Sequence, residues 1–215
     1  MAITISLRRD KSFSPFRKEL IDLCQARGLG DLILCSGYIW EGGTYSVLDD
    51  DLLDAIKIGV GSNQVICVAG KLAKKPIDWH LHYKNFHSKI SGAGIKVAAH
   101  VAPKRNWHAK IAMRLDTKGQ PVAAIVGSSN LTGPAYGENR YTWNYECDVT
   151  MWSPAARGSE PAAERNADQD PFTFAAVDLD ESFSQPSIDS RLQVLFDDIF
   201  RERESFVDLA NYPGE

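Results

Sequence analysis

Three short stretches of the sequence carry side chains that could act together on a phosphate group. The first, Asn-Trp-His-Ala-Lys at 106–110, contains His108 and Lys110. A neutral imidazole is a nucleophile, and a lysine ammonium beside it attracts phosphate. Because side chains two residues apart on a strand leave the same face, a strand here would present both groups together. This stretch therefore indicates chemistry at a phosphate.

The other two stretches add neutral donors and a carboxylate. Gly-Ser-Ser-Asn-Leu-Thr at 127–132 follows an apolar run, and its glycine lets a ligand approach the backbone while Ser128 and Asn130 offer donors. Glu146 opens the next expected strand, where its carboxylate could accept an imidazole N–H and fix the tautomer. Each stretch alone is more often a turn or an exposed pair of residues than a functional site. The order of all three along the chain is what indicates a functional site.

This order resembles the HKD motif of the phospholipase D superfamily, in which H-x-K is followed by G-S-x-N and then by an acid. It is most similar to the branch of small single-motif enzymes that includes bacterial nonspecific nucleases and metal-independent restriction endonucleases. The resemblance implies cleavage of a phosphodiester without metal, through a phosphohistidine. It implies that His108 is the nucleophile or the acid and that Lys110 and Asn130 hold the phosphate. Ser128 would be a supporting donor, and Glu146 would orient an imidazole.

The chain departs from the full motif and carries it once. Leu115 stands where the motif has an Asp, and the side chain of Asp116 would face the other side of a strand. The mechanism that the resemblance implies needs two histidines, whereas this chain supplies one motif. The resemblance therefore implies a homodimer in which His108 of each chain faces one phosphate across a twofold axis.

A basic segment surrounds the first stretch. Residues 71–110 carry nine Lys or Arg and one acidic residue, whereas 151–215 carry fourteen acidic residues and five Arg. The basic block favours a polyanion as partner, and a solvated face offset by the acidic tail is an equal alternative. Further substrate contacts are expected from Lys84, Lys104, Arg105 and Ser129.

The elements that must position these groups alternate along the first half of the chain. Hydrophobic periodicity predicts helices at about 14–27, 49–58 and 78–91, with buried strands at 32–39, 64–69 and 95–101. Three further strands are predicted at 108–115, 121–126 and 145–152. This pattern favours a phospholipase D-like α/β fold with a mixed, mostly parallel sheet and helices on both faces.

The domain organisation follows from the same pattern. A catalytic core is expected over 1–152, and an acidic loop rich in Pro, Ser and Ala over 153–186. The last segment, 187–215, carries an amphipathic helix to about residue 210 that we expect to pack on the same domain.

Composition sets the remaining expectations. The 215 residues are 44% hydrophobic and 24% charged, and no apolar run is long enough to span a membrane. The four cysteines form no CxxC pair, and His80 and His87 are too far apart on a helix to share a zinc ion easily. We therefore expect no metal, no cofactor, no membrane partner and a cytoplasmic location.

The favoured function is a metal-independent endonuclease that acts as a homodimer on DNA, or else on RNA. The acidic C-terminal residues are poorly suited to reading DNA, so a larger complex that supplies specificity stays open. Two alternatives remain: a phospholipid phosphodiesterase, and a module of the same fold that binds nucleic acid or assembles with a partner without cleaving.

Overall fold

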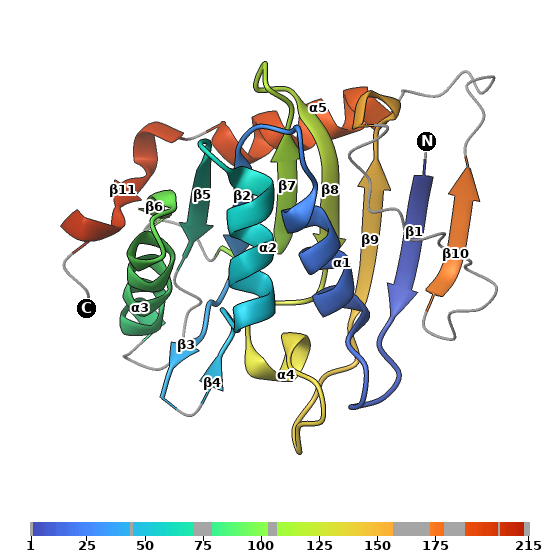
Figure 1. The fold of residues 1–215 in the computed structure, drawn as a ribbon, viewed down its shortest axis with the longest axis horizontal. Coiled ribbons are helices and arrows are strands. Elements are labelled where there is room, and N and C mark those ends of the chain that lie inside the picture. Colours follow the sequence, from blue (N-terminus) through green and yellow to red (C-terminus); the bar gives the residue numbers. More distant parts are fainter. Residues whose placement is uncertain are drawn as a thin grey trace.

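A nine-stranded sheet forms the centre of the protein. The computed structural model describes residues 2–43, 45–70, 79–102, 107–156, 173–178, 188–201 and 203–212. Among these residues the strand order is β10-β1-β9-β8-β7-β2-β5-β6-β11, as Figure 1 shows. The strands of this sheet are β1 (Ala2–Leu7), β2 (Leu32–Ser36), β5 (Gln64–Ala69), β6 (Lys96–Val101), β7 (Ile111–Leu115), β8 (Pro121–Gly127), β9 (Cys147–Trp152), β10 (Thr173–Asp178) and β11 (Val207–Asp208). A separate hairpin is formed by β3 (Glu41–Gly42) and β4 (Tyr45–Ser46).

The sheet is mixed, as predicted, but it is not mostly parallel. Among the described strands, β2 pairs parallel with β5 and β5 with β6, while every other pair is antiparallel. The physical reason is the length of the connections. A parallel pair needs a crossover, which a helix supplies after β2 and after β5, whereas β7 and β8 are joined by a short hairpin.

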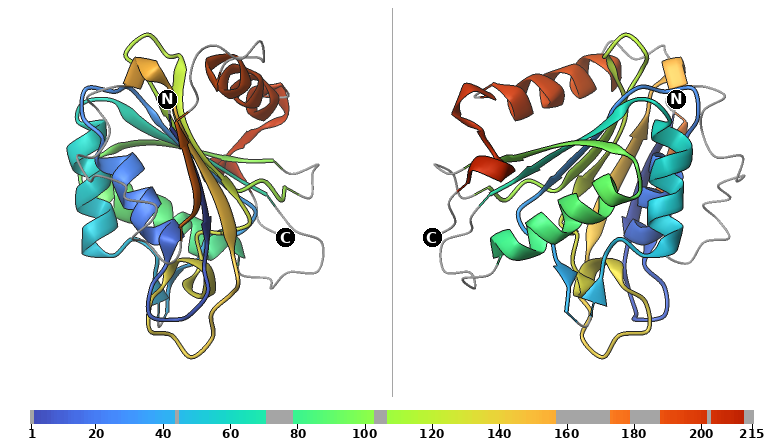
Figure 2. Two further views of the ribbon diagram at one scale, coloured as in Figure 1. Left: turned by 90° about the vertical axis from the view of Figure 1, so that its right-hand side faces the viewer. Right: turned by 60° about the vertical axis from the view of Figure 1, so that its left-hand side comes forward.

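Helices lie on both faces of the sheet, which confirms that part of the prediction (Figure 2). One face is covered by α1 (Pro15–Gln25), α2 (Asp50–Val60) and α3 (Trp79–Gly92), and the other by α5 (Ile188–Phe200). The short α4 (Gly133–Tyr136) lies at one end of the sheet, beyond the strands (Figure 1). The helix predicted at 78–91 is α3, and the apolar residues that recur at helical spacing along it are all buried: Trp79, Tyr83, Phe86 and Ile90.

The N- and C-terminal parts of the chain differ from the prediction. The unpredicted β1 lies between β9 and β10, and β10 itself falls within the segment expected to be a loop. The C-terminal helix ends at Phe200 rather than near 210, because the chain turns through Arg203–Ser205 so that β11 can pair with β6. It does pack on the sheet, through Ile188, Leu192 and Ile199. The division into 1–152, 153–186 and 187–215 stays a prediction.

Strand register brings four strand ends to one edge of the sheet. Because β2 and β7 are antiparallel, Cys35 near the end of β2 pairs with Ile111 at the start of β7. Ile111 also pairs with Val126, and Gly127 pairs with Asp148. The end of β2, the start of β7, the end of β8 and the start of β9 therefore meet, at the end of the molecule where Figure 1 shows α4.

Candidate active site

His108 and Lys110 lie immediately before β7, not within a strand as predicted. They are nevertheless together, because the Lys110 Nζ lies 2.8 Å from His108 Nδ1 and 2.8 Å from the His108 carbonyl oxygen. The lysine side chain is buried, with 7% of the residue exposed, while His108 is exposed. The pair thus combines an accessible imidazole with a cation fixed beneath it.

The contact with Lys110 decides which tautomer His108 adopts here. An ammonium group has three donors and no acceptor, so it donates to Nδ1 and leaves the ring hydrogen on Nε2. A neutral imidazole in this form has no lone pair on Nε2 with which to attack, and it can act as an acid only after a second proton binds at Nδ1. Attack by Nε2 on phosphorus instead requires a hydrogen on Nδ1 and an acceptor for it, and a carboxylate suits that role.

Asn130 faces this pair from the loop after β8. The Ser36 hydroxyl donates to the Tyr38 carbonyl at 2.7 Å, lies 3.3 Å from Asn130 Oδ1 and accepts from the Leu131 N–H at 3.2 Å. Ser36 therefore ties the end of β2 to the loop that carries Asn130. This holds the Asn130 amide, a neutral group that can bind phosphate oxygens, at the end of β2.

Gly37 lies between the two halves of the motif. A Cβ atom at this position would lie 2.7 Å from the Trp107 carbonyl oxygen, 3.3 Å from His108 Cα and 3.6 Å from Asn130 Oδ1. A glycine is therefore required for the close approach of the backbone at 107–108, and the same distances place His108 near Asn130.

Glu146 is buried directly before β9, and its carboxylate is bound within the chain. It accepts a hydrogen bond from the Ser128 hydroxyl and another from Asn144 Nδ2 at 3.0 Å. The Ser128 hydroxyl also accepts from the Cys147 N–H at 3.0 Å. Among the described contacts, none joins Glu146 to His108 of the same chain. Ser128 thus supports Glu146, and the expected role of Glu146 in orienting an imidazole stays a prediction.

Ser129 has a structural contact rather than an open surface. It is buried, and its hydroxyl donates to Asp148 Oδ2 at 2.6 Å while its N–H lies 3.3 Å from Asp148 Oδ1. Burial raises the pKa of the Asp148 carboxyl from 3.8 to about 6, and the nearby charge of Glu146 adds to the rise while the bonds from Ser129 oppose it. Ser129 was predicted to contact substrate, and these contacts assign it instead to holding the loop against β9.

The raised pKa of Asp148 gives an expected pH dependence of stability. Between pH 4 and 6 the folded protein binds the Asp148 proton more tightly than the unfolded chain does, so this group's contribution to stability is lost as the pH rises through about 6. From pH 4 to 7, wild type should lose roughly 2 kcal/mol of unfolding free energy relative to Asp148→Asn. Urea unfolding at several pH values measures this difference.

A matched control is available on α2. Asp54 is exposed, and Asp54→Asn should leave the pH profile of stability close to that of wild type. A difference between wild type and Asp148→Asn that stays constant from pH 4 to 7 would contradict the assignment.

Of the remaining predicted substrate contacts, only Lys84 lies among the described residues, and no described contact brings it to the site. Lys84 lies half-buried on α3. The neighbouring His82 and Asn85 of that helix contact the Glu41 carbonyl of β3 through their side chains. No described contact joins Lys84 to His108. Lys104 and Arg105 lie outside the described residues, so their roles stay predictions.

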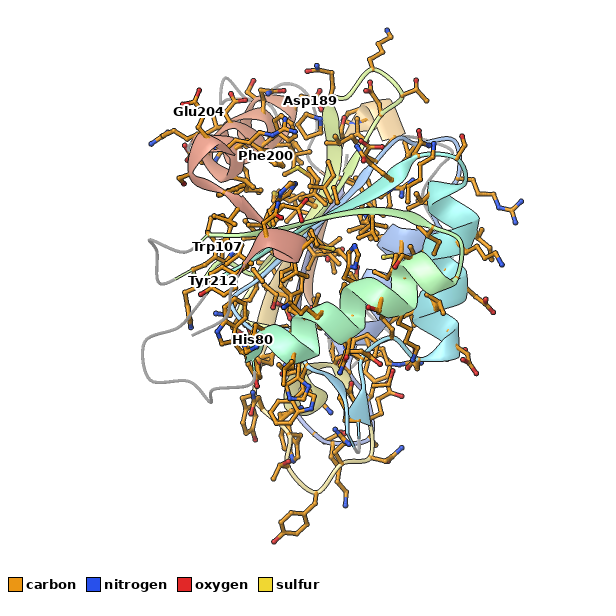
Figure 3. All side chains as sticks on the ribbon, turned by 90° about the vertical axis from the view of Figure 1, so that its left-hand side faces the viewer. His80, Trp107, Asp189, Phe200, Glu204 and Tyr212 are labelled. Atoms are coloured by element: carbon orange, nitrogen blue, oxygen red, sulfur yellow. The ribbon has the colours of Figure 1, made fainter. Side chains whose placement is uncertain are left out.

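Trp107 is a core residue that positions its neighbour. A tryptophan beside the motif could stack on bases or fill a dimer interface, but Trp107 is buried, with its ring 6.1 Å from that of Phe206 at an interplanar angle of 85°. A Cβ at Gly70 would lie 2.3 Å from the Trp107 Cβ. Figure 3 labels Trp107 beside the sheet, between the C-terminal segment and α3. Packing around Trp107 therefore fixes the backbone that carries His108.

Sequence reasoning missed several residues that build the site. Ser36 and Gly37 come from a strand end about seventy residues before His108, and no local pattern marks them. Arg8 is 1% exposed and donates to the carbonyls of Pro134, Ala135 and Gly137, which holds α4 and the loop before Glu146 in place. A basic residue directly after an alternating apolar segment was the available signal for Arg8.

The described residues contain neither a candidate metal cluster nor a helix that could span a membrane. No group of three or more His, Cys, Asp or Glu side chains among them is placed to hold a metal ion. In the same residues, no helix has the length and apolar character that crossing a membrane requires.

Comparison with known proteins gives similarity at the level of the fold. The structure is similar to that of phosphatidylserine synthase from Haemophilus influenzae Rd KW20, with a TM-score of 0.48, 13% identity, and coverage of 94% of this chain and 46% of that one. The structure is also similar to that of polyphosphate kinase from Porphyromonas gingivalis, with a TM-score of 0.46 and 11% identity. That match covers 70% of this chain and 21% of the kinase. For yeast tyrosyl-DNA phosphodiesterase the TM-score is 0.40 and the identity is 15%, and the match covers 69% of this chain and 31% of that one. The chain spans less than half the length of each of these three proteins.

No protein-family model matches the sequence, and a search of curated proteins gives no match either.

Proposed function

We propose that this protein is a phosphodiesterase of the phospholipase D type that cleaves nucleic acid without a metal ion. The observation that supports this most strongly is the meeting of His108, Lys110 and Asn130 at one sheet edge, although they come from two separate stretches of sequence. An exposed imidazole next to a buried cation and a neutral amide matches the needs of an in-line attack on a phosphate.

The reaction proceeds in two steps. In the first, an imidazole Nε2 attacks phosphorus, the P–N bond forms and the P–O bond to the leaving group breaks, while a second imidazole gives its proton to the leaving oxygen. In the second, that imidazole takes a proton from water, which attacks phosphorus and releases the histidine. Lys110 and Asn130 stabilise the charge that develops on the nonbridging oxygens.

We infer that the second imidazole comes from a second copy of the chain. The acid must be an imidazolium with hydrogens on both ring nitrogens, whereas the nucleophile must be a neutral imidazole with its hydrogen on Nδ1, so the two roles need two imidazoles. The nucleophile needs a carboxylate at Nδ1, and the Glu146 carboxylate has no contact with His108 of its own chain. A twofold axis through the site would let Glu146 of one chain meet the imidazole of the other, so that identical histidines take different roles.

Nucleic acid is the substrate class that the charge distribution favours. Lys and Arg are concentrated in residues 71–110, which flank the motif, although the whole chain carries a net charge of −4. A local basic block in an acidic protein attracts a polyanion to one site. DNA is the first choice, and RNA and phospholipid remain as outcomes of the test.

Cleavage in the presence of a chelator tests this proposal. Wild-type protein should cut a labelled DNA oligonucleotide in excess EDTA at the rate seen with added magnesium. Parallel reactions with RNA and with phospholipid vesicles identify the substrate class. Cutting that appears only with magnesium would contradict the mechanism, and headgroup release without cutting of any nucleic acid would favour the phospholipid alternative.

Mixing of subunits tests whether the site is shared between two chains. When wild type and His108→Ala are combined in equal amounts and exchanged by unfolding and refolding, random pairing makes about a quarter of the dimers fully wild type. If each site needs both histidines, activity should fall to about a quarter of that of the same total amount of wild-type chains. Retention of about half would show that each chain acts on its own, and would contradict the shared site.

A further inference from the structure

An exposed tryptophan is held rigidly close to the site. Trp40 is 38% exposed, and its ring stacks on that of His82 with centroids 4.4 Å apart and planes 27° from parallel. The Tyr38 ring contacts it edge-on at 5.6 Å. His82 is itself fixed, because its Nδ1 donates to the Glu41 carbonyl at 2.9 Å. One face of the Trp40 indole is therefore covered by an immobilised ring.

The backbone links Trp40 directly to the residues of the motif. Its N–H donates to the carbonyl of Leu131, the residue after Asn130, at 2.8 Å, and Ile39 forms a parallel bridge with Leu131. Trp40 follows Gly37 by three residues, so their Cα atoms are at most about 11 Å apart. Gly37 in turn approaches His108 closely. Trp40 therefore lies on the segment that runs from Gly37, beside His108, to the loop that carries Asn130.

This arrangement is unusual for a residue whose role is only to fold the chain. A large aromatic side chain normally gains its stabilising effect by being buried, as Trp107 and Trp152 are in this protein. Trp40 instead keeps part of its surface in water, while its orientation is already fixed by His82 and Tyr38. Fixing a ring before a ligand arrives lowers the entropy that binding must remove.

We propose that the exposed part of Trp40 stacks on a nucleobase next to the phosphate bound at His108, and that the protein therefore prefers single-stranded nucleic acid. This inference rests on the proposed function. Base–aromatic stacking is independent of sequence, because every base presents a flat π surface. In a duplex both faces of a base are already stacked, so Trp40 could engage only an unpaired or displaced base.

Binding of single strands that lack one base tests the inference. Oligonucleotides with a single abasic position, moved one nucleotide at a time, are titrated into full-length protein carrying His108→Ala so that no cutting occurs. Trp40→Leu, which keeps apolar contact with His82 but has no aromatic face, should bind the intact strand about 5- to 30-fold more weakly. The His108→Ala protein with Trp40 intact should lose affinity by the same factor when the base that stacks on Trp40 is missing. For that abasic strand, Trp40→Leu should bind no more weakly than the protein that keeps Trp40.

Two further variants separate stacking from structural effects. Trp40→Phe should recover most of the affinity, because it restores a ring. Tyr141→Leu removes a fully exposed aromatic residue and should leave binding unchanged. Duplex DNA should show little difference between Trp40→Leu and its parent.

The outcomes distinguish this inference from the proposed function. If wild type cuts nucleic acid but Trp40→Leu binds every strand as its parent does, the stacking site is wrong and the function stands. If wild type neither cuts nor binds nucleic acid, both are wrong. If Trp40→Leu instead changes the monomer–dimer equilibrium and binds single strands normally, Trp40 belongs to an interface between two copies and the inference is overturned.

Discussion

Replacement of His108 by alanine is expected to reduce cleavage by at least about 10⁴-fold, which corresponds to roughly 5 kcal/mol of transition-state stabilisation. His108 supplies the atom that forms the bond to phosphorus, and no described residue next to Lys110 could replace it. Because His108 is exposed, its loss should leave the folding of the chain intact. Initial rates in EDTA measure the activity, and urea unfolding measures the stability.

The control for this substitution is another histidine. His87 lies half-buried on α3, and His87→Ala should keep cleavage within a few-fold of wild type. If His108→Ala retained cleavage within tenfold of wild type while remaining folded, the nucleophile would have to lie elsewhere.

Gly37→Ala is expected to lower kcat by about 10²-fold, although Gly37 carries no functional group. The added methyl group would lie 2.7 Å from the Trp107 carbonyl oxygen, which is closer than non-bonded atoms can approach. Since Trp107 is fixed by packing, the strain passes to the backbone of His108 or to the loop of Asn130. Displacing a reacting group by about 1 Å can cost two orders of magnitude in rate.

A second glycine provides the comparison for Gly37. At Gly92, the last residue of α3, a Cβ would meet no atom within 4 Å, so Gly92→Ala should leave kcat unchanged. Both variants are assayed for kcat and for unfolding by urea. A Gly37→Ala protein with wild-type kcat would show that the site does not depend on this close approach.

Local sequence patterns predicted the parts of the fold that depend on neighbouring residues. The stripe of α3 appeared in the sequence because its four apolar residues recur at helical spacing, and all four are buried. The end of β8 at Gly127 was likewise predicted from an apolar run followed by glycine. Such features follow from hydrophobic periodicity and turn chemistry alone.

Features of the fold that depend on pairing between strands far apart in the sequence were either not predicted or predicted wrongly. The expectation of a mostly parallel sheet was wrong, because the parallel pattern of β2, β5 and β6 does not continue past β6. The six residues of β1 have no neighbouring partner in sequence and are ordered by β9 and β10. For the same reason, Ser36 and Gly37 could not be assigned to the site from sequence, whereas the residues of the motif could.

The stereochemical course at phosphorus tests the central claim most directly. A single-stranded oligonucleotide with one phosphorothioate of known configuration is cleaved in EDTA in ¹⁸O-labelled water, and the configuration of the product is determined. Attack by a His108 imidazole followed by attack of water inverts phosphorus twice, so the account requires net retention. Net inversion would mean that water attacks phosphorus directly, and would contradict a phosphohistidine intermediate.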